Sequence, residues 1–536
     1  MRRRARTTTR AGAAAWRNLE RRGTTRSAGV DGAVGRSRAN HVPLAISDSR
    51  TTRTSTPAKS VPSPSSQEFG SGALVEVDRP RGNSTTAQAM ANSVNILLGV
   101  GLLSVPYALQ QGGWAGLGVL GVLGVTTNYT GKILIRCQRR GSLPALDDSS
   151  GDALGTKGGT NDCGGAGAAA RGVITDPDAS SSMDSLSCDW DDPLEPTRRP
   201  LLSYEDVGEA AFGANGRRFI TWVLYTELIG TCALFFILEG DHLEILFDHA
   251  HTQEWFMCAA AAVMIPTLWL SDLSSLSFIG GLGACASLSL VGVVLYELVA
   301  VGGFPHTLPP ALETTALVHL STLPVSFGLL AFVFAGHAVF PAIYTSMREP
   351  GEYEGMLDKT YAIVGATCLL IGGAGYALYG DGVADEVTLN LPTGVASTLA
   401  LALVTVNPFS KFALTMDPVS RGLEKALGVD INGEGGGGVE RDWGAPLKAR
   451  LMRTGLGAGA LLTAAKVPFF AVFMSLIGSF LTLTVSVIFP SACYLRMFED
   501  ELTDNERVAN WAIMLLGGFC VVAGSASAIN ATLDQF

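Results

Sequence analysis

The stretch "NSVNILLGVGLLSVPYALQQGGW", residues 92–114, is apolar enough to cross a membrane, yet it carries features that weaken a helix at its centre. Gly99 and Gly101 lie in its middle, Pro106 follows, and Asn95 places a polar amide one turn before the glycines. In lipid every backbone N–H and C=O needs a partner, so a helix is interrupted only where it is buried in protein or lines a cavity. The stretch therefore predicts a broken helix beside a site within the membrane.

A second apolar stretch, "LLAFVFAGHAVFPAIY" at residues 329–344, repeats this design, with Gly336 and His337 midway and Pro341 beyond them. Tight helix packing is an equally good explanation for a single glycine pair, because small residues are common where membrane helices touch. The two quoted stretches are the first and the sixth of the apolar spans counted below, and their matching interruptions favour a break. In carriers built from inverted repeats, the ends of half-helices present free backbone groups to the substrate at mid-membrane.

The composition indicates a multi-spanning membrane protein. Of the 536 residues, 47% are hydrophobic and only 16% are charged, against about 25% charged in an average soluble domain. The apolar residues fall in runs of about 20, the length that crosses about 30 Å of hydrocarbon. We expect an all-α fold with about eleven transmembrane helices, at 86–109, 114–137, 218–240, 254–270, 276–301, 321–345, 358–379, 394–416, 452–471, 473–496 and 508–530.

The polar segments predict the domain organisation and the orientation. Residues 1–85 read as a disordered cytosolic tail, although an Arg-rich, acid-poor tail is also typical of an organelle transit peptide. Residues 86–137 would form helices 1 and 2, 138–202 a disordered cytosolic loop, and 203–530 helices 3 to 11, with a flexible loop at about 426–448. Among the connections, only those on the side of the N-terminus carry Lys and Arg, so the N-terminus is predicted to be cytosolic and the C-terminus luminal.

Ionisable residues within spans are costly and are therefore functional candidates. Glu227, His337 and Lys411 are the candidates for proton coupling; a structural ion pair for Lys411 and a neutral structural role for His337 remain open. Glu239 and Asp241, at the end of span three, are expected to be solvated. The same holds for the loop with His242, His249 and His251, whose spacing fits no compact metal site. The nine cysteines show no C-x-x-C, and we predict no metal site.

Several long phrases carry a family resemblance: "NILLGVGLLSVPYALQQGGW", "YEDVGEAAFG", "IPTLWLSDLSSLSFIG", "STLPVSFGLLAFVFAGHAVFPAIYTSM" and "VNPFSKFALTMDPV". Over 86–137 and 203–530 the chain resembles the amino acid/auxin permease family, in particular its vacuolar amino acid transporter branch, which is related to the vesicular inhibitory amino acid transporter. The resemblance implies a LeuT-like inverted repeat of two five-helix halves with broken helices 1 and 6, usually coupled to protons.

The resemblance also implies where the substrate binds. The α-amino and carboxylate groups of an amino acid would meet the backbone of Asn95, Gly99, Val100 and Gly101, facing Ala335 and Gly336 across the site. Thr405 matches a position that, with the asparagine of span one, holds sodium in sodium-coupled relatives. A fixed ammonium at Lys411, on the same span, would disfavour a sodium ion and favour proton coupling.

The expected function is secondary active transport of L-amino acids, most consistent with neutral ones, across a vacuolar or lysosome-like membrane by alternating access. The partners are the substrate, protons and the lipid bilayer, with no nucleic acid; the tail and residues 141–200 are candidate docking segments for cytosolic regulators. No cofactor is expected beyond the transmembrane proton gradient, and no enzymatic motif is present. Two alternatives remain open: a plasma-membrane permease of the same family, and an amino acid sensor with little transport.

Overall fold

The computed structural model describes residues 82–144, 198–270, 274–300, 309–392, 394–429, 445–467 and 469–533. They belong to the compact unit Val75–Phe536. Most of the expected tail, residues 1–81, and the interiors of the two expected loops, 145–197 and 430–444, lie outside the described residues.

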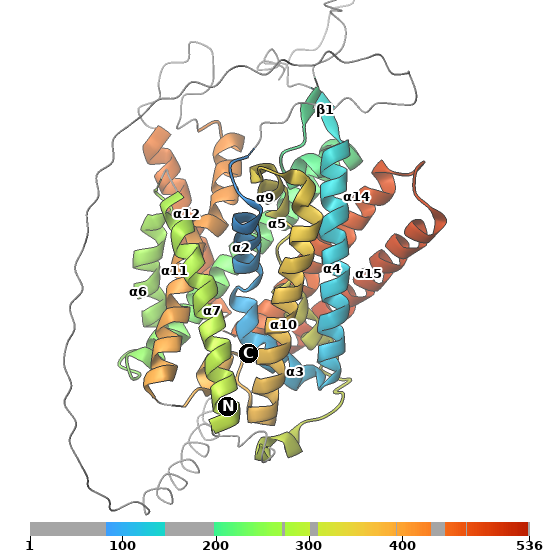
Figure 1. Cartoon of the computed structure of the whole chain (residues 1–536). Helices are drawn as coiled ribbons and strands as arrows, with labels where there is room; N and C mark the ends of the chain where they lie inside the picture. Colours follow the sequence, from blue (N-terminus) through green and yellow to red (C-terminus); the bar gives the residue numbers. More distant parts are fainter. Residues whose placement is uncertain are drawn as a thin grey trace, which may run out of the picture. The chain divides into compact units, whose positions relative to one another are not determined.

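The first span is broken where the sequence predicts it (Figure 1). Thr85 caps helix α2 (Thr86–Leu97) through a reciprocal capping box with Gln88. The helix ends just before Gly99, and the chain continues as a 3₁₀ turn, η1 (Val100–Ser104), and then as α3 (Val105–Gly112). The two halves are bent by 46°, and Pro106 lies in the first turn of α3, where a proline removes no helical hydrogen bond.

The sixth span is broken in the same way. Helix α8 (Leu323–Val333) ends before the predicted break, and α9 (Phe340–Ser346) begins after it, with Pro341 in its first turn. The backbone of Ser84, just before the first span, hydrogen-bonds to Ser346 and Arg348 at the end of the sixth. The two interrupted spans are therefore tied together at one end of the bundle.

The remaining predicted spans each fall on a described helix or helix pair: α4 (Ala115–Arg140), α5 (Tyr204–Leu246), α6 (Gln253–Thr267), α7 (Ser274–Ala300), α10 (Tyr353–Tyr379), α11 (Val395–Ala426), α12 (Ala445–Lys466), α13 (Phe470–Ile477) with α14 (Phe489–Met497), and α15 (Asp504–Leu533). In the described part of the chain, five helices and the bent pair of the first span are long and apolar enough to cross a membrane by themselves. The all-α, multi-spanning fold with spans one and six interrupted is confirmed, whereas the count of eleven stays a prediction.

Short elements complete the described part: the 3₁₀ turns η2 (Pro310–Thr314), η3 (Pro350–Glu352), η4 (Gly380–Gly382) and η5 (Val387–Asn390), and the antiparallel strands β1 (Ser142–Pro144) and β2 (Arg198–Pro200). The sequence does not predict the strand pair. It joins residues on either side of the long polar loop, within the segment 138–202 that the sequence assigns to disorder.

Two spans differ from their predicted form. Helix α5 begins at Tyr204, earlier than expected, because Ser203 caps it through Asp206 and a kink at Gly213 (φ 67°) redirects the chain before the apolar run. The span from Phe470 to Met497 contains two π-helical segments, η6 (Gly478–Thr482) and η7 (Thr484–Ile488). Such wide turns re-aim side chains and are frequent at functional sites.

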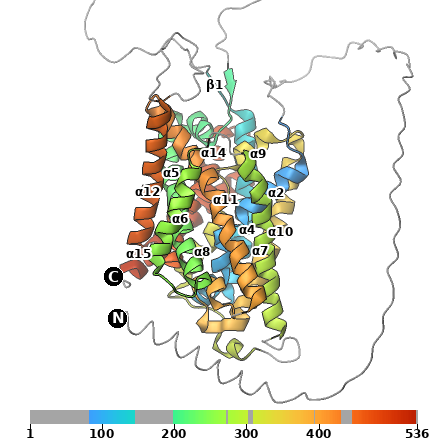
Figure 2. The same cartoon turned by 90° about the vertical axis from the view of Figure 1, so that its left-hand side faces the viewer.

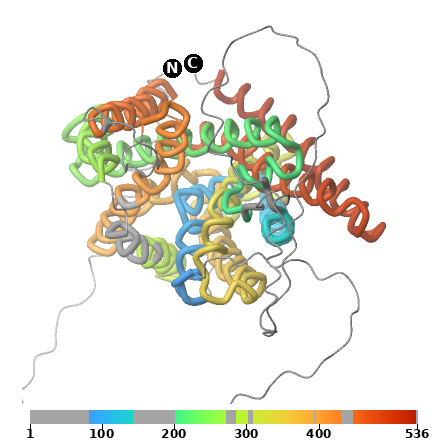
Figure 3. Tube along the Cα trace, turned by 90° about the horizontal axis from the view of Figure 1, so that it is seen from above, coloured from blue at the N-terminus to red at the C-terminus, as the bar shows by residue number. Residues whose placement is uncertain are grey.

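Helix α11 packs along α7 and α5, as the side view in Figure 2 shows. Seen from above, span one lies beside the segment that contains α10 (Figure 3). Small residues allow the closest contacts: a Cβ at Gly478 would overlap the carbonyl of Gly328, so η6 and α8 touch through their backbones. The segment η6 also packs against α5 and η7, so these elements lie together beside the two breaks.

Candidate functional site

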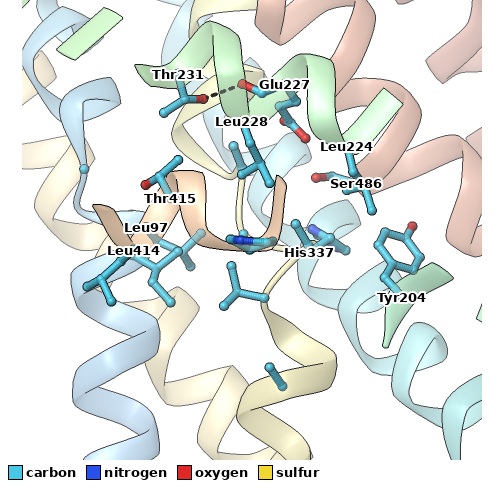
Figure 4. Close-up of a pocket in the computed structure, with 18 of the residues that line it drawn as sticks. Leu97, Tyr204, Leu224, Glu227, Leu228, Thr231, His337, Leu414, Thr415 and Ser486 are labelled. Carbon is cyan, nitrogen blue, oxygen red and sulfur yellow. Dashed lines mark hydrogen bonds between the residues drawn. The ribbon is translucent and has the colours of Figure 1, made fainter. Parts of the chain in front are cut away.

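A cavity of about 540 Å³ lies between the two helix breaks and is also lined by α5, α11 and η7. At one end it reaches the surface beside the exposed residues Asn92, Leu202, Ala342 and Pro418. We call this its open end. Toward the opposite, closed end the cavity stops at Phe235, Phe332 and Val333, all buried. Figure 4 shows side chains from several elements around it, among them Glu227, His337 and Ser486.

Nine of the ten predicted site residues line this cavity: Asn95, Gly99, Val100, Gly101, Ala335, Gly336, His337, Glu227 and Lys411. They come from spans one, three, six and eight, which the two breaks and the long α5 bring together. The chain therefore gathers almost all of the candidates in one place, although no ligand is present to show what each one binds.

The backbone groups freed by the first break have partners. The last carbonyls of a helix have no N–H four residues further on, and here the Lys411 ammonium donates to the Asn95 carbonyl oxygen at 2.7 Å. The Ser287 hydroxyl of α7 donates to the Leu98 carbonyl at 3.0 Å. A cation at the C-terminal end of a half-helix is favoured by the helix dipole. Lys411 thus occupies the position at this break where a small cation would find its ligands.

The glycines of the breaks are required by close packing and not by a left-handed backbone. None of Gly99, Gly101 and Gly336 has a positive φ. A Cβ at Gly101 would lie 3.0 Å from the Cα of Val333, and one at Gly336 would lie 2.8 Å from a methyl of Leu97. Gly99 is less crowded, because a Cβ there would lie 3.2 Å from the Ile96 carbonyl oxygen. Each break is therefore pressed against the other.

Glu227 is a buried carboxyl in the cavity wall, 5% exposed. Its Oε1 accepts a 2.6 Å hydrogen bond from the Thr482 hydroxyl, which the π-helical segment η6 turns toward α5. Within the described residues it forms no ion pair. An ionised carboxylate in a buried site without a cation is strongly disfavoured, so this environment suits the protonated acid.

His337 is fully buried in the wall of the same cavity. Its Nε2 lies 3.1 Å from the Thr130 hydroxyl, whose shortest hydrogen bond, 2.6 Å, goes to the Ser486 carbonyl. The hydroxyl has one hydrogen, so Nε2 donates and Nδ1 carries the lone pair; Nδ1 has no hydrogen-bond partner among the described residues. His337 and Glu227 are not paired with each other in this state, because each is bonded to a threonine.

Thr405 is the candidate that lies apart from the cavity. Its hydroxyl donates to the Leu401 carbonyl at 2.8 Å and lies 3.3 Å from Nδ1 of His242. Its neighbour is thus a histidine of α5, which the sequence placed in a solvated loop. His242 and Glu239 are both fully buried, so the expectation that they are solvated is wrong. Helix α5 runs on to Leu246 and carries both into the protein.

Sequence reasoning missed several polar groups at the site. Tyr204, whose hydroxyl donates to the Val485 carbonyl at 2.7 Å, and Ser486 both line the cavity. Ser287 and Thr482 bond to the break and to Glu227. The available signal was the run of hydroxyl residues in "LTLTVSVIF" of the tenth span, but helical periodicity does not reveal a π-helical turn.

The chain is similar to known proteins over most of its length. The family model described as "Transmembrane amino acid transporter protein" matches residues 82–148 and 192–530. Two Arabidopsis thaliana proteins, amino acid transporters AVT1B and AVT1C, are each 32% identical; the matches cover 84% of this chain and 72% and 71% of theirs. Among solved structures, a Na⁺-coupled sialic acid symporter is 12% identical with a TM-score of 0.47, covering 82% of this chain and 89% of the symporter.

Proposed function

The chain belongs to the transmembrane amino acid transporter family, and from that premise we propose that it moves neutral amino acids by alternating access driven by protons. It is a multi-pass membrane transporter and not an enzyme. The observation that carries the proposal is the contact of the Lys411 ammonium with the Asn95 carbonyl at the break in span one, in the wall of the cavity of about 540 Å³.

This contact supports coupling to protons over coupling to sodium. Carbonyls at the end of a half-helix are suitable ligands for a sodium ion, but a lysine ammonium already donates to one of them. Bringing a second cation to the same carbonyl would place two positive charges within a few ångströms in a poorly solvated site, which Coulomb repulsion opposes. A lysine can also give up its proton when it is desolvated, so the same contact can respond to protons.

Glu227 is the second group that supports proton coupling. It is a buried carboxyl whose described hydrogen-bond partner is the Thr482 hydroxyl, and it lines the cavity in which the substrate would bind. Water entering from one side would favour its ionised form, and closure would favour the protonated acid. We assign the transported proton to the carboxyl of Glu227. Lys411 provides the positive charge at the break, and His337 is a neutral residue of the cavity wall.

The lining supports a neutral side chain on the substrate. Leu224, Leu228 and Leu414 contribute apolar surface beside the two breaks (Figure 4). The ammonium of Lys411 is engaged by a backbone carbonyl, and Glu227 by a threonine. A charged substrate side chain would need one of these groups to be released, so an amino acid without a third charge fits with the fewest unpaired polar atoms.

The open end of the cavity lies beside the starts of α2 and α5, which the distribution of Lys and Arg assigns to the cytosol. On that orientation the structure corresponds to a carrier open to the cytosol. The resemblance to the vacuolar branch supports a vacuolar membrane with its acidic lumen on the closed side. Cofractionation of the tagged protein with a vacuolar membrane marker tests this, and enrichment in the plasma membrane would contradict it.

The substrate assignment is tested by counterflow in proteoliposomes that contain the purified protein and one amino acid inside. We expect accumulation of labelled neutral amino acids, competition by other neutral ones, and weak competition by lysine or glutamate. A carrier that prefers a charged amino acid would contradict the proposed substrate class. Binding without any counterflow would instead favour the sensor alternative.

A further inference from the structure

A group of buried polar side chains lies at the closed end of the bundle, outside the substrate cavity. His242 of α5 is its centre: Nε2 lies 3.1 Å from Oε2 of Glu386 and 2.9 Å from the Thr388 hydroxyl, while Nδ1 faces Thr405 of α11. His242 and Glu386 are both fully buried. The contacts join α5 and α11 to residues 383–390, the segment between α10 and α11.

The hydrogen-bond pattern determines which atoms can carry protons. The one hydroxyl hydrogen of Thr405 goes to the Leu401 carbonyl, so His242 must donate from Nδ1. A neutral His242 then presents the lone pair of Nε2 to the Thr388 hydroxyl. Oε2 of Glu386 lies 3.1 Å from the same nitrogen and has no hydrogen-bond partner among the described residues. An ionised Glu386 would place a carboxylate against that lone pair. The pair is attractive only when it holds a proton, either as a carboxylic acid donating to Nε2 or as an imidazolium donating to the carboxylate.

Among the described residues, no cation lies beside Glu386 to replace that proton. The groups that interact with Glu386 electrostatically are the carboxyls of Glu239 and Asp241 on α5 and of Asp385 beside it. On α11 the described group that faces His242 is the Thr405 hydroxyl. On α13 the backbone of Ala471 forms a hydrogen bond with Asp385. Both carboxylate oxygens of Glu239, a fully buried side chain, have no hydrogen-bond partner among the described residues.

Burial, and after it the neighbouring Asp385 carboxyl, raises the pKa of Glu386 well above its ordinary value. A hydrated glutamate titrates at about 4.3, so between that value and the raised one the closed arrangement holds more protons than an opened, hydrated one. Falling pH therefore stabilises the closed arrangement, and this stabilisation is lost as the pH rises through the raised pKa.

This group is connected to the substrate cavity in two ways. Residues 387–390 (η5) pack against η1, the turn that follows the break in span one. Glu227, Thr231 and Phe235 line the cavity at four-residue spacing along α5, and Glu239 is the next position on that helix face. The buried carboxyl therefore lies one turn beyond Phe235, at the closed end of the cavity.

We propose that His242 and Glu386 form a proton-binding latch, in which an added proton holds residues 383–390 against α5 and its loss lets this end of the transporter open. The latch rests on the proposed alternating-access cycle and adds a second proton site to it, distinct from Glu227. Closing of this end takes up a proton from the compartment it faces, and opening returns one, so this compartment must be acidic enough for the cycle to proceed.

Counterflow with equal pH on both sides tests the latch without a gradient. Between about pH 5.5 and about pH 8 the rate of the native protein should fall by about tenfold. Glu386→Gln, whose amide can donate to Nε2 and cannot lose its proton, should make the rate vary by less than about twofold over that range. Glu244→Gln is the matched control: this α5 carboxyl pairs with the exposed His249, and its variant should keep the native profile.

A native profile in Glu386→Gln, or a flat profile in the native protein, would overturn the latch. If Glu386→Gln does not yield folded protein, His242→Gln decides, because a carboxyl without its imidazole partner should shift the midpoint of the profile by about one pH unit or more; an unshifted midpoint contradicts the proposal. Failure of the proposed coupling has a different signature: varying the inner pH at fixed outer pH would then leave uptake unchanged, whatever the equal-pH profile.

Discussion

The Lys411 ammonium donates a 2.7 Å hydrogen bond to the backbone carbonyl of Asn95, so a side chain of span eight completes the end of a half-helix in span one. The contact bridges two elements that must separate or rotate if the cavity is to open at its other end. The charge of Lys411 therefore acts on the backbone conformation at the break in span one.

Replacing this lysine tests the link. Lys411→Met keeps the length of the side chain but leaves the Asn95 carbonyl without its donor, at a cost of about 1–3 kcal/mol. We expect accumulation driven by a pH gradient to fall by about tenfold or more, with folded protein still recovered from the membrane. Lys425→Met, on the same helix beyond the site, is the control. Native accumulation by Lys411→Met would remove the lysine from the coupling mechanism.

Gly101, the more crowded of the two glycines in the first break, gives a steric prediction. A side chain at Gly101 would push against Val333, so Gly101→Val should lower counterflow by about tenfold or more and cost about 1–3 kcal/mol through overpacking. Gly118→Val in α4 is matched to it, because a Cβ there meets nothing within 4 Å. Thermal unfolding of both variants separates lost stability from lost transport, and equal counterflow in the two would refute the steric role.

Glu227 and His337 are distinguished by paired variants. Glu227→Gln should retain exchange at equal pH yet lose gradient-driven accumulation, because the amide cannot release a proton. His337→Gln should keep the response to the gradient and instead raise the substrate KM by several-fold, because Nε2 is a donor to Thr130 and His337 lines the cavity. The reverse result would assign proton coupling to His337 and not to Glu227.

Removing residues 1–81 tests whether transport needs the N-terminal tail. The described bundle begins at residue 82, and the contacts of Ser84 with Ser346 and Arg348 remain in the shortened chain. We expect its counterflow to stay within about twofold of the full chain, since none of the cavity residues is removed. A severe loss of counterflow in folded protein would indicate that the tail takes part in the transport cycle.

The sequence predicts the breaks well because their signal is local. Glycine followed within a few residues by proline marks both interruptions, at Gly99 and Gly101 in span one and at Gly336 in span six, and both fall within a few residues of the expected positions. The gathering of Asn95, His337, Glu227 and Lys411 in one cavity follows from those breaks together with the family resemblance. The helix ends were less predictable: Gly213 extends α5 well before its apolar run through a positive φ that composition does not indicate.

The latch could not be predicted in this way. His242 and Thr388 are 146 residues apart, and Glu386 lies in a segment whose polar sequence, "GDGVADEVTLN", is typical of a solvated connection. Burial of its carboxyl results from the packing of that segment against α5 and η1, a tertiary effect without a local pattern. Thr405 illustrates the same limit. The family resemblance placed it on span eight as part of the binding site, but in the structure its hydroxyl lies beside His242 of span three.

The most direct measurement of the central claim is the initial uptake of a labelled neutral amino acid into proteoliposomes, with and without an imposed pH gradient, in sodium and in choline buffers. With Lys411 at the Asn95 carbonyl, we expect uptake to rise with the gradient, to collapse with a protonophore, and to be the same in both buffers. Uptake that requires sodium and ignores the pH gradient would contradict the account.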